Sequence, residues 1–242
     1  MVMGWSRARS LSWRRRVVAG TAIAGTTLLG VSLSTKPGSP RFYGLTGAVA
    51  AVWLAGGLAS GPLHRGRTVR GGGRPVVGPV LLGVGAFGAF YAAALVARPI
   101  PPLRDAIAGI LQYAHEGTSP LVLFTTLANG AAEETFFRGA VFAAAGDRAP
   151  VTVTTAVYTL ATTATGNPAL VLASIPMGAL FALQRRGTGG IQAPLITHLT
   201  WSTLMLTFLP PLFAKRSTCS SHEPRSGQPG CLSKSRTQRP LS

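Results

Sequence analysis

Long apolar stretches alternate with short basic or glycine-rich loops along most of the chain. Stretches of about 17 to 25 residues are long enough to cross a bilayer as helices. In chain order the apolar stretches cover residues 17–33, 42–63, 76–97, 119–145, 151–165, 168–184 and 191–213, of which 151–165 is shorter and 119–145 longer than this range. This pattern predicts an all-α protein, a polytopic transmembrane helical bundle with about seven spans, in a range of roughly six to eight.

Polar segments divide the chain into four predicted parts. These are a basic N-terminal segment at 1–16, N-terminal transmembrane helices and loops at 17–118, a C-terminal helical core at 119–213, and a polar basic tail at 214–242. Within the second part, the mixed residues 103–118 predict a short amphipathic or interfacial helix. The tail is rich in serine and proline, which predicts disorder.

The charge is strongly positive and lies mainly outside the apolar stretches. The net charge is +17, while charged residues make up only 12% of the chain and hydrophobic residues 47%. A basic protein is a candidate for nucleic-acid binding. Arginines in loops between spans are better explained by the positive-inside rule, which sets membrane topology. The sequence therefore predicts a multi-pass cell-membrane protein with a cytoplasmic N-terminus, lipid as a partner and no nucleic-acid partner.

Two adjacent glutamates, Glu133 and Glu134, lie inside an apolar stretch of a chain with only six acidic residues. The free energy of inserting a carboxylate at membrane depth is unfavourable by about 2.5 to 3.5 kcal/mol. Such a residue therefore indicates a functional site when a partner can be named. Arg138 is one helical turn after Glu134 and can pair with it. Glu133 is rotated by about 100° and requires a water-filled cavity, a metal or a proton. The cluster predicts a general base at Glu133 or, as an alternative, a structural ion-pair network between helices.

Further polar side chains lie in the later spans. His198 is in the middle of the last span, and Ser202 follows one turn later. A neutral imidazole and a carboxylate can together hold a divalent metal or a water, so we expect His198 and Glu133 to reach one wet pocket. The alternative is a buried histidine bonded to a backbone carbonyl. Tyr158 and Thr162 are four residues apart, and hydrogen bonding between helices is the simpler interpretation for them.

The sequence Glu133-Glu134-x-x-x-Arg138, followed by a late His198, resembles the motif of the CPBP family. This family comprises CAAX prenyl proteases and bacteriocin-processing or immunity-type intramembrane proteases. The resemblance covers residues 119–213 and implies a CPBP-like protease core there. It implies that Glu133 activates the hydrolytic water, that Glu134 and Arg138 brace the site, and that His198 holds the metal or water and polarises the scissile carbonyl. It also implies a divalent metal such as zinc on His198 and Glu133, and a membrane-associated peptide or protein substrate.

Two positions depart from the family pattern. Tyr158-x-x-x-Thr162 replaces the usual Phe-x-x-x-His, and His198-x-x-x-Ser202 replaces His-x-x-x-Asn. One glutamate and one histidine provide too few ligands for a typical catalytic zinc site, which usually has three protein ligands. The predicted function is an intramembrane endopeptidase that uses a water activated by Glu133. The alternatives are a catalytically degenerate membrane scaffold or immunity-type relative, and a small proton-coupled transporter with Glu133 and His198 as a relay.

Overall fold

The computed structural model describes residues 2–68, 73–115 and 119–213. Over these ranges the regular structure is entirely helical, which confirms the all-α prediction. In chain order the helices are α1 (Val2–Leu33), α2 (Pro40–Ala59), α3 (Val77–Ala97), α4 (Pro101–His115), α5 (Ser119–Glu133), the π-helix η1 (Glu134–Val141), α6 (Phe142–Ala145), α7 (Pro150–Thr163), α8 (Pro168–Thr188), α9 (Gln192–Phe208) and α10 (Pro210–Phe213).

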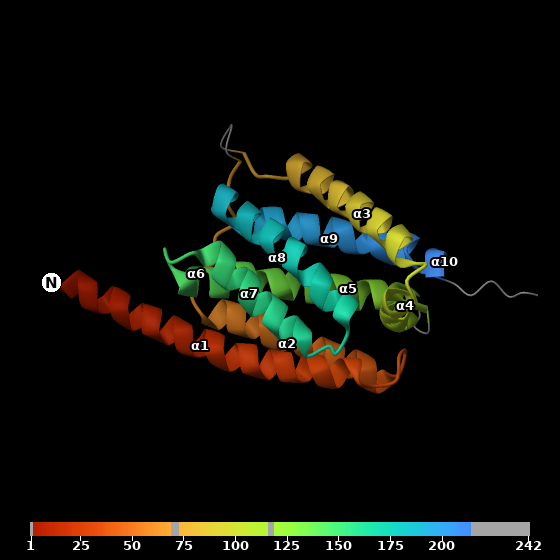
Figure 1. Cartoon of the computed structure of the whole chain (residues 1–242). Coiled ribbons are helices and arrows are strands. Elements are labelled where there is room, and N and C mark those ends of the chain that lie inside the picture. The colour runs from red at the N-terminus through yellow and green to blue at the C-terminus, as the bar shows by residue number, and fades with distance from the viewer. Residues whose placement is uncertain (1, 69–72, 116–118, 214–242) are drawn as a thin grey trace, which may run out of the picture.

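The long helices lie side by side in a bundle, and α4 lies across one end of it (Figure 1). Three pairs of helices pack along much of their lengths, namely α1 with α2, α3 with α9, and α7 with α8. Helix α5 and its continuation η1 lie in the middle and contact α2, α9 and α7. The helix that carries the adjacent glutamates is therefore the central element of the bundle.

Four helices among the described residues are long and apolar enough to cross a membrane. They are Leu11–Leu33 within α1, Pro40–Ala59, Val77–Ala97 and Pro168–Thr188. The helices α5, η1 and α6 also follow one another without interruption, while α7 and α9 are shorter, at 14 and 17 residues. The protein is thus an all-α helical membrane bundle, and the count of about seven spans stays a prediction.

The predicted boundary at residue 16 lies inside a helix. Helix α1 begins at Val2, so the basic segment 1–16 is continuous with the first apolar helix. The predicted short helix at 103–118 corresponds to α4, which ends at His115. The predicted disordered tail at 214–242, with both cysteines, lies outside the described residues.

Local sequence signals explain where several helices begin and end. The side chain of Ser39 accepts a hydrogen bond from the backbone N–H of Phe42, and Pro40 occupies the first turn of α2. Asn167 caps α8 in the same way, again with a proline in the first turn. Gly189 ends α8 in the left-handed conformation, with φ of 72°. These are the residue types preferred at such positions, because they satisfy free backbone N–H groups or tolerate positive φ.

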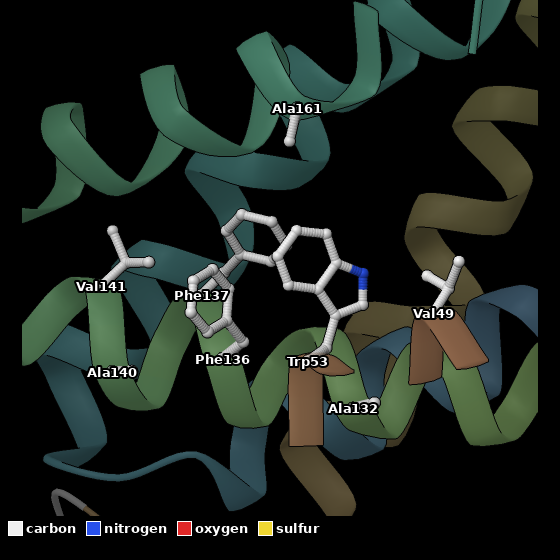
Figure 2. Packing of buried hydrophobic residues seen from close by; sticks show 8 residues of the cluster. All are labelled: Val49, Trp53, Ala132, Phe136, Phe137, Ala140, Val141 and Ala161. Atoms are coloured by element: carbon white, nitrogen blue, oxygen red, sulfur yellow. The ribbon is translucent and has the colours of Figure 1, made fainter. Parts of the chain in front are cut away.

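A core that contains three aromatic side chains packs η1 against α1 and α2 (Figure 2). The ring of Trp53 on α2 lies 4.7 Å from that of Phe136 and 5.1 Å from that of Phe137. All three side chains are buried. A Cβ atom at Gly25 on α1 would collide with the Trp53 ring, so glycine is needed for this close approach. The core therefore holds the helix segment that carries the charged residues of the site.

Candidate active site

The two glutamates lie at a change of helix type. Glu133 is the last residue of α5, and Glu134 is the first residue of the π-helix η1. Short π segments inside helices are rare and often occur at functional sites, because they change the rotation of the side chains that follow. Glu134 is fully buried with 0% exposure, whereas Glu133 is partly exposed. The neighbouring carboxylates therefore have different surroundings.

Glu134 is the centre of a buried polar triad with Arg138 and His198. Its Oε1 atom accepts a hydrogen bond from Nη1 of Arg138 at 3.0 Å. The same oxygen lies 2.9 Å from Nδ1 of His198. An ionised carboxylate only accepts hydrogen bonds, so Nδ1 of His198 carries the proton in this contact. The triad joins the central helix to α9 through a charge-assisted network.

The guanidinium of Arg138 is enclosed by aromatic rings as well as by its carboxylate partner. Its central carbon lies 4.6 Å from the ring centroid of Tyr158 and 4.9 Å from that of Phe181. Nη2 donates to the backbone carbonyl of Gly178 at 3.4 Å. Cation–π contacts of desolvated arginines stabilise the charge by up to about 2 kcal/mol. These contacts offset the cost of burying the arginine.

His198 is held in a defined orientation. Its ring stacks on Phe181, with centroids 4.8 Å apart and an interplanar angle of 22°. Because Nδ1 is bound to Glu134, the other nitrogen, Nε2, is available on the opposite side of the ring. A Cβ atom at Gly130 would lie 3.5 Å from Nε2, so glycine leaves space beside this nitrogen. Carboxylate–histidine pairs of this kind fix the tautomer of a reactive imidazole.

Glu133 faces a partly open cavity rather than the triad. Its Oε2 atom accepts a hydrogen bond from the hydroxyl of Tyr158 at 3.3 Å. The cavity has a volume of about 360 Å³, and Glu133, His198, Ser202 and Thr162 are among its lining residues. Most of the remaining lining is apolar. The structure therefore brings a carboxylate and an imidazole to one cavity inside the bundle.

Thr162 and Ser202, the two positions that depart from the family pattern, differ in whether their hydroxyl groups are free to act in this cavity. The hydroxyl of Thr162 donates to the backbone carbonyl of Tyr158 at 2.9 Å, within its own helix. Ser202 is 6% exposed and lies one turn after His198 along α9. Ser202 is thus the better placed of the two hydroxyls to donate to a group bound beside His198.

The contacts of His198 extend the arrangement expected from the sequence. The spacing of residues along the helix predicts a pair between Glu134 and Arg138 only. In the structure, His198 also contacts the carboxylate oxygen of Glu134 that binds Arg138. Phe181 was not among the expected site residues, because its contacts cross from α8 to α9 and to η1. Gly130 was also missed, although its position one turn before Glu134 is a signal in the sequence for a small residue on the same helix face.

The side chains do not form a complete metal site. Among the described residues, no group of three or more His, Cys, Asp or Glu side chains is arranged to hold a metal ion. Nδ1 of His198 and Oε1 of Glu134 are bound to each other, which leaves Nε2 of His198, the carboxylate of Glu133 and the unpartnered Oε2 of Glu134. Catalytic zinc usually has three protein ligands. Because these side chains do not form such a group, the donor set does not fit the implied metal.

The helical membrane bundle thus carries a buried polar site on its central helix. Residues 116–204 match the family model described as type II CAAX prenyl endopeptidase Rce1-like. This segment is therefore similar to the CAAX protease family, in agreement with the resemblance carried by Glu133, Glu134 and Arg138. The match covers less than half of the chain and includes His198. Searches among curated proteins and among solved structures gave no match.

Proposed function

We propose that this protein is an intramembrane endopeptidase that hydrolyses a peptide bond with a water activated by Glu133. The observation that carries the proposal is the position of Glu133 on the same cavity as His198. Within the described part of the chain, the ion pair of the central helix involves Glu134, and no cation lies within ion-pair distance of Glu133. A carboxylate that faces a cavity without a fixed cation is suited to accept a proton.

In the first step, water between Glu133 and the substrate attacks the carbonyl carbon, and Glu133 takes the proton. Negative charge then develops on the carbonyl oxygen. In its protonated form, His198, held through Nδ1 by Glu134, donates from Nε2 to this oxygen. The hydroxyl of Ser202 is a second donor from the same helix. Fixed donors aimed at a developing oxyanion typically contribute about 2.7 to 4 kcal/mol each.

In the second step, Glu133 returns its proton to the amide nitrogen, and the carbon–nitrogen bond breaks. The products are a carboxylic acid and an amine, and both catalytic groups return to their starting states. The hydroxyl of Tyr158 orients Glu133 through its hydrogen bond. No step requires a metal, in keeping with the incomplete donor set.

The apolar lining suggests the kind of substrate. Leu29, Val122 and Leu209 also line the cavity. Such a lining favours an apolar, membrane-associated peptide or protein segment over a charged, water-soluble peptide. We propose that the substrate enters from the membrane with its scissile bond beside Glu133.

The proposal is tested with Glu133→Gln, which keeps the side-chain shape but cannot accept the proton. Wild-type and variant protein are purified and incubated with detergent-solubilised membrane proteins, and new peptide N-termini are identified by mass spectrometry. We expect N-termini that the wild type generates and the variant does not. The matched control is Asp105→Asn, an exposed carboxylate on α4, which should leave cleavage unchanged. Equal cleavage by the Glu133 variant would remove this residue from the mechanism.

The second candidate function is a non-catalytic relative that acts as a membrane scaffold or immunity factor. It is favoured by Thr162, whose hydroxyl is bound within its own helix where the family usually has a histidine. The experiment above separates the two, because a scaffold would produce no new N-termini in either protein. A membrane partner that co-purifies equally with wild type and Glu133→Gln would then support the scaffold.

A further inference from the structure

A second pocket lies outside the proposed active site, between the loop after α2 and the turn from α8 to α9. Its volume is about 580 Å³. The residues around it are small, hydroxyl-bearing or basic, and none is acidic. They are His64, Arg65, Gly66, Arg67, Arg74, Thr188 and Gly189.

Backbone hydrogen bonds fix the two walls of this pocket to each other. The N–H of Ile191 donates to the carbonyl of His64 at 2.9 Å, and the N–H of Gln192 donates to that of Arg65 at 3.1 Å. A third bond, at 2.9 Å, runs from the N–H of Arg67 to the carbonyl of Thr188. The side chains of Arg65 and Arg67 therefore project from a backbone that is held in place.

Two glycines allow the walls to approach so closely. Gly66 has a φ of +88°, and a Cβ atom there would lie 2.7 Å from the carbonyl oxygen of Thr188. A Cβ atom at Gly190 would collide with the backbone of Arg65 and Gly66. Each glycine is required by backbone contact rather than by a flexible side chain. The three backbone hydrogen bonds, here called the clasp, therefore depend on glycine at both positions.

The pocket concentrates positive charge without a counter-charge. The side chains of Arg65, Arg67 and Arg74 are exposed, and none of them is in an ion pair with another described residue. Like charges that line one pocket repel one another, and a bound anion would relieve this repulsion. The planar donors of guanidinium groups also match the oxygens of a phosphate in a bidentate geometry.

The pocket is at the level where membrane spans end. The candidate spans α2 and α8 end at Ala59 and Thr188, and α3 begins at Val77. The last turn of α8 adds Arg185 and Arg186 at the same end. Clusters of basic residues directly beside transmembrane helices commonly bind anionic headgroups. We propose that this pocket binds a phosphate group, carried by an anionic lipid headgroup or free in solution.

The site has a structural connection to the proposed active site. The clasp holds Ile191 and Gln192. Ile191 directly precedes α9, the helix that carries His198, and Gln192 is its first residue. A bound phosphate would stabilise the start of this helix. The binding proposal itself does not depend on the proposed peptidase activity.

The test compares two double variants that each remove two exposed arginines. Arg65→Gln with Arg67→Gln alters the pocket, whereas Arg41→Gln with Arg98→Gln removes the same charge at the opposite ends of α2 and α3. Full-length protein in detergent is titrated with short-chain phosphatidylglycerol, with short-chain phosphatidylcholine and with inorganic phosphate at constant ionic strength. Binding is followed by native mass spectrometry and by the shift in thermal unfolding temperature.

We expect the wild type and the Arg41/Arg98 variant to bind phosphatidylglycerol with similar Kd. We expect the Arg65/Arg67 variant to bind it about tenfold more weakly or worse, because charge-assisted hydrogen bonds are lost. Saturable binding of inorganic phosphate as well would identify a free anion as a ligand, and binding of phosphatidylglycerol alone would identify the headgroup. If the pocket variant does not fold, Arg74→Gln against Arg41→Gln repeats the comparison. Equal weakening by both members of a pair, or no saturable binding to the wild type, would overturn the proposal.

Discussion

Nδ1 of His198 lies 2.9 Å from Oε1 of Glu134, although the two residues are 64 positions apart in the chain. This contact connects α9 to the central helix and orients the imidazole. It leaves Nε2 on the side of the ring where Gly130 provides space. The buried Glu134 therefore positions the imidazole, while the neighbouring Glu133 remains available in the cavity.

The first prediction concerns Glu134→Gln. The substitution leaves Arg138 buried without its carboxylate, and removing one partner of a buried pair typically costs about 3 to 5 kcal/mol. We expect a clearly lower unfolding temperature in detergent, measured by intrinsic fluorescence. Glu133→Gln is the matched control and should unfold near the wild-type temperature. The double variant Glu134→Gln with Arg138→Gln should lose less stability than the sum of its single variants, since the pair is coupled.

The second prediction separates the two roles of Tyr158. Tyr158→Phe removes the hydroxyl that donates to Glu133 but keeps the ring over Arg138. One such hydrogen bond contributes only about 0.5 to 1.5 kcal/mol to stability, so we expect a small decrease in unfolding temperature. We expect a several-fold fall in kcat/KM, because Glu133 loses the contact that orients it. Tyr158→Leu also removes the cation–π contact and should lower the unfolding temperature. A fall in stability for Tyr158→Phe as large as that for Tyr158→Leu would contradict this separation.

The third prediction concerns the aromatic core. Trp53→Ala removes the ring that packs on Phe136 and Phe137, and such deletions typically cost about 3 to 5 kcal/mol. The measurement is thermal unfolding of the purified protein. Trp13→Ala is the matched control, because Trp13 is 59% exposed. A similar loss in both variants would show that the core does not hold η1 as the contacts indicate.

The fourth prediction concerns metal removal. Because the described side chains form no group of three or more that could hold a metal, we expect cleavage to continue after exhaustive dialysis against a chelator. Elemental analysis of the purified protein should show less than about one tenth of an equivalent of zinc, since catalytic zinc is usually held by three ligands. Activity that is lost with the chelator and restored by zinc would refute the metal-free mechanism.

Several features of the fold could be predicted because their causes are local. Apolar length predicts membrane helices, and Ser39 and Asn167 mark helix starts through short-range capping. The pair between Glu134 and Arg138 also follows from helical spacing, which places residues four apart on one face. A count of spans is harder to obtain, because α7 and α9 are short and their boundaries depend on their neighbours.

Other features depend on contacts between distant segments. The basic loop after α2 is held to the turn between α8 and α9 by backbone hydrogen bonds, which no local sequence signal predicts. The stacking of Phe181 on His198 likewise has no local signal. Such contacts depend on how whole helices are rotated and packed, and sequence spacing does not specify those rotations.

The sequence by itself determined that this chain forms apolar helices and that two carboxylates and an imidazole lie within them, since length, hydropathy and residue chemistry are properties of short segments. Only the tertiary structure decided that Glu134 binds His198 and that Glu133 faces the cavity. The reason is geometric: the π-helix begins between these two glutamates, and the packing of α9 against the central helix selects which carboxylate the imidazole meets.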